Sequence, residues 1–243
     1  MAVPQKGETL DDLQNGYYII QSESGFRFGM DAVLLAEYTE IRSAERVLDL
    51  GCGNGILPLL LAARNPAMYM TGLELNHESA ELAKRNVRYN HLENRIVIEE
   101  GDIREAVSRF GAASFDVIVS NPPYMIFSHG KVSPNGQIAM ARHEVCCTFR
   151  DLACAAEGLL RDHGRLYLVH RPFRLAELLH TLREYRLEPK RMRLIHPFAD
   201  REANMVLIEA VHGGNARITV EPPLIVYDQP GIYTEELQKI YHM

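Results

Sequence analysis

Residues that can do chemistry gather where apolar runs end, beginning with the turn LDLGCGNG. In this turn Gly51, Gly53 and Gly55 follow an apolar run at 46–50 and precede a helical pattern. Glycine tolerates positive φ and lets the backbone approach a ligand closely. A glycine turn between a strand and a helix is typical of many nucleotide-binding α/β folds.

The residues around these glycines distinguish two kinds of ligand. A dehydrogenase turn reads G-x-G-x-x-G and aims a helix N-terminus at a pyrophosphate. Here the pattern is G-x-G-x-G, Ile56 stands where that third glycine would fall, and Asp49 lies two residues before the first glycine. A carboxylate repels a pyrophosphate and attracts a cationic or amino-bearing ligand. The turn therefore favours S-adenosylmethionine, which carries a sulfonium and an α-ammonium group, over a dinucleotide.

Two more acids stand near the ends of the next two apolar runs. Glu74 lies 23 residues after Gly51, and Asp102 ends the stretch EGD. In a doubly wound sheet the first position faces a ribose, whose hydroxyl protons a carboxylate can accept, and the second can accept the amine of an adenine. A single acid at a strand end is more often a surface residue or a cap. Three acids at successive strand ends predict a cofactor site at that edge.

The elements that must position these residues alternate along the chain. Strands are predicted at 46–50, 68–75, 96–102, 115–121 and 165–170, and helices at 56–65, 77–90, 150–160 and 174–185, with a DHG turn ending the third helix. This alternation predicts an α/β fold with a Rossmann-like, doubly wound, seven-stranded, mostly parallel sheet. RMRLIHP and NMVLIEAV have no helix-sized gap between them, so we expect a closing hairpin with an antiparallel edge strand.

SNPPYM, at 120–125, ends the fourth of these strands, because prolines donate no hydrogen bonds to a sheet. Together and in this order, VLDLGCGNG, GLELN, EGD and NPPY resemble the class I S-adenosylmethionine-dependent methyltransferases over roughly residues 46–210. The resemblance implies an S-adenosylmethionine-dependent N-methyltransferase without a metal. The cofactor-binding residues that we expect are Phe28, Asp31, Asp49, Gly51, Gly53, Asn54, Gly55, Glu74, Leu75, Asp102, Ile103 and Asn121.

The NPPY motif implies the type of acceptor atom. In the families that it resembles, Asn/Asp-Pro-Pro-Tyr/Phe marks enzymes that methylate a planar nitrogen, in amino groups of bases or in glutamine amides. The resemblance makes Asn121, Pro122, Pro123 and Tyr124 the catalytic residues. The Asn121 Oδ1 and Pro122 carbonyl oxygens would accept the two hydrogens of the NH₂ group, and the prolines would stiffen the loop. Tyr124 would stack on the target base. The alternative interpretation of the whole motif is a plain Pro-Pro turn without a catalytic role.

The flanking segments indicate which nitrogen is methylated. GFRFGMDAVLLAEY, ARHE, LVHRP and YTEE resemble the bacterial tRNA adenine-N6-methyltransferases that act just 3′ of the anticodon in a valine tRNA. This predicts transfer to adenine N6 in tRNA, with Tyr124, Arg142, His143 and Arg171 binding the substrate. An N5-glutamine methyltransferase of a protein such as a release factor, a guanine-N2 methyltransferase of rRNA, and a silent RNA binder remain alternatives. The first usually carries a helical domain before the core, where this chain has only about 45 residues.

One structural domain is expected, with an N-terminal extension at 1–45, a methyltransferase core at 46–212 and a C-terminal tail at 213–243. The extension is read as a strand-like piece, a turn and a cofactor-covering helix that Asp31 can cap. In the tail, a DQPG turn precedes a short helix that Thr234 can cap, with Glu235 and Glu236 at the positive end of its dipole.

The composition bounds the location and the partners. Four cysteines without a C-x-x-C pattern, a polar N-terminus and no apolar run of roughly 18 residues predict a cytoplasmic protein that binds no membrane. We expect a monomer or a homodimer. The net charge of −6 argues against a large nucleic-acid footprint. Residues 161–201 hold ten Lys/Arg against five Asp/Glu, so a local basic face for tRNA is one reading and a solvated surface the other.

Overall fold

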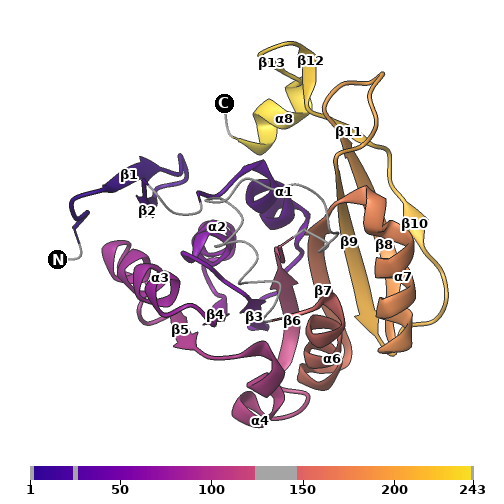
Figure 1. Ribbon diagram of the computed structural model, residues 1–243, viewed down its shortest axis with the longest axis horizontal. Helices are drawn as coiled ribbons and strands as arrows, with labels where there is room; N and C mark the ends of the chain where they lie inside the picture. Colours follow the sequence, from indigo (N-terminus) through magenta and orange to yellow (C-terminus); the bar gives the residue numbers. More distant parts are fainter. Residues whose placement is uncertain (1–2, 24–26, 124–146, 242–243) are drawn as a thin grey trace, which may run out of the picture.

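The computed structural model describes residues 3–23, 27–123 and 147–241. Its central sheet follows the order β5-β4-β3-β6-β7-β9-β8. The first five are mutually parallel and β9 runs antiparallel between β7 and β8, which confirms the predicted fold and closing hairpin (Figure 1). The bounds are β3 Arg46–Leu50, β4 Tyr69–Glu74, β5 Ile96–Glu100, β6 Phe115–Ser120, β7 Leu160–His170, β8 Leu187–His196 and β9 Met205–His212.

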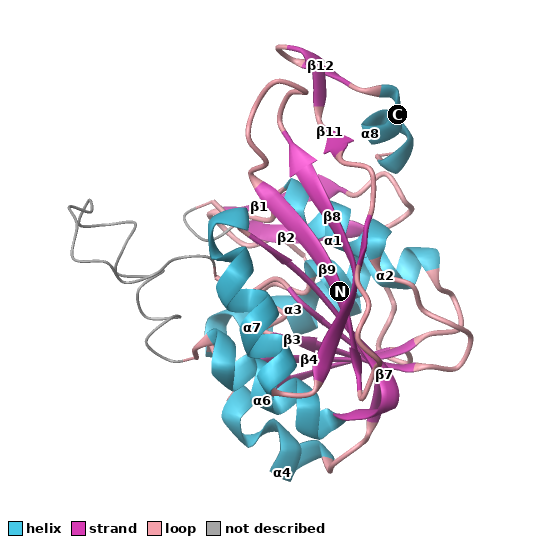
Figure 2. Cartoon of the chain, turned by 90° about the vertical axis from the view of Figure 1, so that its right-hand side faces the viewer, coloured by secondary structure: helices cyan, strands magenta, loops and turns pink. Residues whose placement is uncertain are grey.

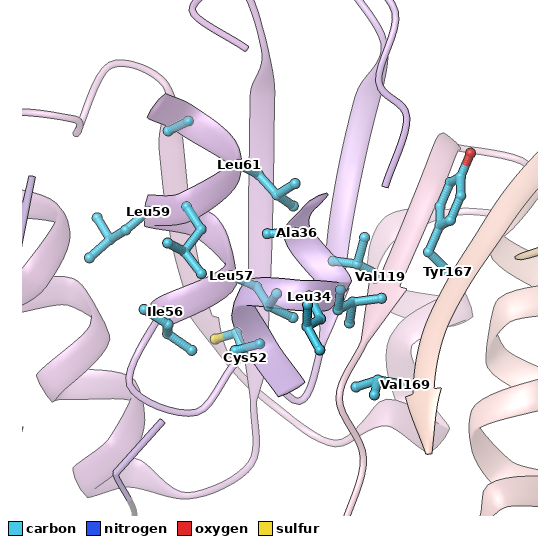
Figure 3. Close-up of a cluster of buried hydrophobic side chains, with 14 of the residues drawn as sticks. Leu34, Ala36, Cys52, Ile56, Leu57, Leu59, Leu61, Val119, Tyr167 and Val169 are labelled. Carbon is cyan, nitrogen blue, oxygen red and sulfur yellow. The ribbon is translucent and has the colours of Figure 1, made fainter. Parts of the chain in front are cut away.

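Helices cover both faces of this sheet, because its strands are apolar on both sides. Alternate residues of each strand join different cores: Val47 and Val117 belong to one buried cluster, and Leu48 and Ile118 belong to the other. The first cluster is closed by α1 (Met30–Tyr38), α2 (Ile56–Arg64) and α3 (His77–Tyr89), and the second by α4 (Ala106–Phe110), α6 (Phe149–Leu159) and α7 (Leu175–Glu184). Figure 3 shows part of the first, with Leu34 and Leu57 beside Val119, and Figure 2 shows α6 and α7 side by side. In the described ranges, each helix is too short or too polar to cross a membrane.

Two expectations about local structure are wrong. The DHG stretch at 162–164 does not end a helix: α6 stops at Leu159 and the chain enters β7 at once, with a register irregularity that absorbs the stretch. Asp31 is not the cap of α1, because Gly29 occupies the N-cap position and Asp31 lies inside the first turn. A short helical segment, η1 (Ile103–Glu105) followed by α4, was not predicted.

The N-terminal and C-terminal segments pack beside this sheet. Strands β1 (Glu8–Asp12) and β2 (Tyr18–Ser22) form an antiparallel hairpin. The tail adds β10 (Thr219–Val220) and β11 (Leu224–Ile225) alongside β8, then the hairpin of β12 (Tyr227–Gln229) and β13 (Ile232–Tyr233). Helix α8 (Glu235–Ile240) follows, and Thr234 caps it as predicted by accepting a hydrogen bond from Leu237 N.

Two asparagines, Asn86 in α3 and Asn90 at its C-cap, hydrogen-bond the backbone of β2 as a neighbouring strand would. Asn86 accepts from Ile20 N at 2.7 Å and donates to Ile20 O at 3.0 Å, while Asn90 makes the same pair of bonds with Tyr18. Asn86 also donates to Asn54 O in the glycine turn, at 2.9 Å. Asn86 is fully buried, so water could not satisfy these backbone groups if the Asn86 side chain were removed. One side chain thus joins the N-terminal hairpin, α3 and the turn after β3.

Replacing Asn86 by Ala should lower the free energy of unfolding by about 3 kcal/mol, because three buried backbone groups lose their partner. Urea unfolding followed by circular dichroism measures this change. Asn90→Ala is the matched control and should cost about 1 kcal/mol or less, because its bonds to Tyr18 lie at the surface, where water can replace them. Equal losses in the two variants would contradict the role given to Asn86.

Candidate active site

A cavity of about 300 Å³ opens where the parallel strands end. Its wall is built from the carboxyl ends of β3, β4, β5, β6 and β7 and from the start of α6. Ligands of open α/β sheets bind at this edge because successive strands there deliver their following turns to one place. Eight of the residues expected in the site line this cavity: Gly51, Glu74, Leu75, Asp102, Ile103, Asn121, Pro122 and Pro123.

The turn between β3 and α2 keeps its backbone open toward this edge. Gly51, Gly53 and Gly55 all have positive φ, at 81°, 55° and 85°. A Cβ atom placed on Gly51 or Gly53 would meet nothing within 4 Å, so room for a ligand remains above the turn. At Gly55 packing adds to the positive φ as a reason for glycine, because a Cβ there would lie 3.2 Å from the Ala83 side chain of α3.

Glu74, the last residue of β4, is held by two turns at once. Its Oε2 accepts from Gly53 N and its Oε1 accepts from Asn76 N, each at 2.8 Å. The side chain is buried, and the two amides fix the plane of the carboxylate. Each carboxylate oxygen has more than one acceptor site, so the group can also accept hydroxyl protons from a ligand in the cavity.

Asp49 lies beneath the glycine turn rather than on the cavity wall. It is 0 % exposed, and neither carboxyl oxygen has a hydrogen-bond partner among the residues that the structure describes. Burial, and secondarily the charge of Glu74, raise the pKa of Asp49 well above its usual range. A buried, unsatisfied carboxyl group is costly, and a cationic or amino-bearing ligand above the turn would reduce that cost. This observation fits the cofactor that the sequence predicts.

Asp102 is an ionised acid on the same wall. Its carboxylate accepts from Arg104 N at 2.8 Å and pairs with the Arg104 guanidinium, whose hydrogen bonds hold the pKa of Asp102 below its usual value. Asp102 also caps η1, so its orientation is set by the backbone that follows β5. Glu74 and Asp102 therefore form an acidic side of the cavity, as the strand ends predicted.

The NPP segment forms another side of the cavity. Asn121, Pro122 and Pro123 follow directly on β6 and line the wall. The preceding Ser120 donates from Oγ to Leu50 O at 2.7 Å, which ties the end of β6 to the end of β3. Three substrate-binding or catalytic residues named from the sequence, Tyr124, Arg142 and His143, lie outside the described residues.

Several expected residues do not line the cavity. Phe28 and Asp31 belong to the segment that begins α1; Phe28 packs against the first core and its N–H donates to Gln21 Oε1. Asn54 is buried in the glycine turn. Arg171 follows β7, and its Nη1 donates to Asn204 O at 2.8 Å. The seven that are absent from the wall are Phe28, Asp31, Asp49, Gly53, Asn54, Gly55 and Arg171.

The remaining wall was missed by the sequence reasoning. It includes Thr148 and Phe149 at the start of α6, His170 at the end of β7 and Arg174 in the turn that follows. His170 ends the strand predicted at 165–170, but the sequence predicts only its neighbour Arg171 as a site residue. The rule that selected Glu74 and Asp102, a polar residue at the carboxyl end of a parallel strand, also selects His170.

His170 is a neutral imidazole at the cavity. It is 1 % exposed, and burial, helped by the nearby Arg174 charge, lowers its pKa to about 4. Its Nδ1 accepts from Arg171 N at 2.7 Å, so the hydrogen of the neutral ring is on Nε2. The ring packs edge-on against Phe149, with centroids 6.2 Å apart.

The predicted basic face at 161–201 is not a single surface. Arg161 lies near the start of β7 and Arg183 near the end of α7, whereas Arg174 lies at the cavity. Most of these cations are already paired with carboxylates, which favours the reading as a solvated surface. Eight of the ten have a carboxylate within 4.0 Å: Arg161, Arg165, Arg174, Arg183, Arg186, Arg191, Arg193 and Arg201.

Known proteins share this chain's sequence and fold. The model of the methyltransferase small domain family matches residues 24–186. A tRNA1(Val) (adenine(37)-N6)-methyltransferase of Porphyromonas gingivalis is 33% identical over 91% of this chain and 89% of its own. The protein of that description from Aeromonas hydrophila is 29% identical over 90% of each chain. The crystal structure of a predicted O-methyltransferase from Agrobacterium tumefaciens superposes with a TM-score of 0.71 at 26% identity, over 88% of this chain and 96% of that one.

Replacing Asp49 by Asn should raise the melting temperature of the ligand-free protein. The folded protein disfavours the charged carboxylate, so its stability falls as the pH rises above the unfolded pKa, and Asn removes this loss. Each kcal/mol regained shifts the midpoint by about 2–4 °C in a chain of this size. Thermal scans should show the gap widening from about pH 4 upward, while saturating S-adenosylmethionine raises the midpoint of Asp49→Asn less than that of the wild type. Exposed Asp228→Asn is the control, and a lower midpoint for ligand-free Asp49→Asn would contradict the assignment.

His170 should make the protein less stable in mild acid. Because its folded pKa is lowered from 6.5 to about 4, the unfolded state binds a proton first as the pH falls. The free energy of unfolding should drop by about 2 kcal/mol between pH 7 and pH 5 from this group alone. In His170→Asn, whose Oδ1 can still accept from Arg171 N, that part of the pH dependence should vanish in urea titrations. The exposed His163→Asn should keep the wild-type slope; an unchanged slope in His170→Asn would refute this account.

Proposed function

The chain belongs to the methyltransferase small domain family and is an S-adenosylmethionine-dependent methyltransferase, and from this we propose that it methylates the exocyclic N6 of an adenine in tRNA. The observation that carries the proposal is that Glu74 and Asp102, two of the acids expected to bind the cofactor, share one cavity with the NPP segment. A methyl donor and an acceptor nitrogen bound there would lie next to each other, and such placement accounts for much of the rate of a group transfer.

The acidic side of the cavity is the part that we assign to the cofactor. Glu74, held by two backbone amides, would accept the ribose hydroxyls, and Asp102 would accept the adenine amine. The open turn at Gly51 and Gly53 would pass close to the ligand, above the buried Asp49 carboxyl. When bound, S-adenosylmethionine supplies a methyl group on a positively charged sulfur. On this side, the residues of the chain would bind and orient the cofactor.

The NPP side is the part that we assign to the acceptor nitrogen. The lone pair of adenine N6 is delocalised into the ring, so the nitrogen is a poor nucleophile. Asn121 Oδ1 and the Pro122 carbonyl would accept the two N6 hydrogens and favour a geometry in which the lone pair is available. The prolines and the Ser120 bond to Leu50 hold these acceptors in place before the substrate arrives. Tyr124 is proposed to stack on the base.

The choice of tRNA adenine rests on the relatives. The proteins of Porphyromonas gingivalis and Aeromonas hydrophila carry that description and align over about nine tenths of this chain. A glutamine amide presents the same planar NH₂ chemistry, so the NPP segment alone does not separate the two substrates. A protein substrate such as a release factor is therefore the competing outcome of the experiment.

Labelled methyl transfer into total tRNA, compared with transfer into purified release factor, tests the substrate class. We expect label in tRNA only, and nucleoside analysis should identify it as N6-methyladenosine. Label in the release factor would favour the glutamine alternative, and N2-methylguanosine would overturn the assignment of the base.

Replacing Asn121 by Ala should reduce kcat at least 100-fold, because one preorganised acceptor for the reacting nitrogen is lost. The Kd for S-adenosylmethionine, measured by calorimetry, should change less than about threefold, since removing a contact made mainly in the transition state spares ground-state binding. Asn94→Ala, an exposed change before β5, is the matched control for handling and folding. A variant at Asn121 with the wild-type rate would show that this role is wrong.

A further inference from the structure

A turn at the rim of the cavity presents an aromatic ring to solvent. The 3₁₀ segment η2 (Pro172–Arg174) follows β7 and carries Phe173. Phe173 is 71 % exposed, more than any other large apolar side chain in the described ranges. Residues on both sides of it in the chain line the cavity: His170, three residues before it, and Arg174, directly after it.

The backbone that carries Phe173 is firmly held. Pro172 stands at the start of the 3₁₀ turn, and Arg174 N donates to Arg171 O at 3.2 Å to close it. Arg171 N donates to Nδ1 of the buried His170, which packs against Phe149 of α6. The exposure of Phe173 is therefore built into an anchored turn, and a rigid aromatic side chain loses little conformational entropy on binding.

Two arginines, Arg171 and Arg174, stand on either side of Phe173 in the chain, and hydrogen bonds orient each guanidinium group. Arg174 pairs through Nε and Nη2 with both carboxylate oxygens of Glu177, at 2.9 and 2.7 Å. Arg171 donates from Nη1 to Asn204 O. An exposed aromatic ring with arginines beside it in the chain is typical of surfaces that bind single-stranded nucleic acid, where bases stack on the ring.

The position of this turn relative to Asn121 follows from the sheet. Strands β6 and β7 are adjacent and parallel, with Ser120 level with Leu168. Asn121 and His170 are therefore one and two residues beyond the same level, on strands about 4.8 Å apart. Phe173 follows His170 by three residues, so its Cα lies within about 10 Å of the His170 Cα. That reach suits a nucleotide next to the one in the cavity.

We propose that Phe173 is a stacking platform for the unpaired base that neighbours the methylated base in the RNA substrate. This inference rests on the proposed function, and names a subsite for it. Every base offers a π face, so the platform would hold the flanking nucleotide with little regard to sequence. It would keep the strand open beside the cavity while the target base enters.

Fluorescence offers a direct test, because the chain contains no tryptophan. Phe173→Trp places a single indole on the rim, and titration with total tRNA should quench its emission to saturation, since a base stacked on the indole quenches the excited ring by direct contact. Tyr69→Trp is the matched control: Tyr69 is 63 % exposed and begins β4, so it lies at the end of the parallel strands that is opposite to the cavity. Its emission should not change. Equal responses of the two variants, or none from Phe173→Trp while it still methylates tRNA, would overturn the platform.

Kinetics separate stacking from simple apolar contact. Phe173→Ala and Phe173→Leu should each raise the KM for tRNA about tenfold, within the range found when a stacking ring is removed, while Phe173→Tyr keeps the wild-type value. The Kd for S-adenosylmethionine and the kcat should stay within about twofold, and Tyr69→Ala should match the wild type. An unchanged KM in Phe173→Ala refutes the platform and leaves the proposed function standing.

Two other outcomes would point elsewhere. If the wild type transfers no methyl group to tRNA and Phe173→Trp does not respond to tRNA, the proposed function and the platform fail together. If the emission of Phe173→Trp depends on protein concentration without RNA, the ring belongs to a contact between two copies of the chain, and the platform is wrong.

Discussion

The Glu74 carboxylate joins the two turns on which the site depends. One oxygen receives the Gly53 amide from the turn after β3, and the other receives the Asn76 amide from the turn after β4. An anion buried at this point is stable only with such donors, and the donors in turn fix the open backbone around Gly51. The same charge raises the pKa of the buried Asp49. The ligand-free edge thus holds a buried carboxyl group at Asp49 without a hydrogen-bond partner among the described residues, beside the Glu74 charge, which suits a cofactor with positive groups.

Much of this site was predictable because strand ends and chain reversals can be read locally. Apolar runs marked each parallel strand, and the acids Glu74 and Asp102 and the NPP segment at Asn121 stand directly after them. In a parallel sheet those positions must meet at one edge, whatever the details of packing. The cavity at this edge holds all three.

The features that the sequence did not predict depend on contacts between residues far apart in the chain. The basic segment looked like a face, yet Arg165 pairs with Glu45 and Arg161 with Asp116, both far away in the chain. Asn86 resembled an ordinary helix residue, although it completes the edge of β2 some 66 residues away. Phe173 could not be separated from core phenylalanines, because its exposure follows from how η2 leaves the sheet. Local sequence patterns were enough to predict most helices and strands, whereas contacts between residues far apart in the chain determined the features that were not predicted.

A crystal structure with S-adenosylhomocysteine tests the central claim most directly. The account predicts the ribose hydroxyls within hydrogen-bond distance of Glu74, the adenine amine at Asp102 and the sulfur facing the cavity space beside Asn121. With this placement, the methyl donor and the acceptor site lie in the same cavity. A cofactor bound away from Glu74, or with its sulfur turned from Asn121, would contradict the account.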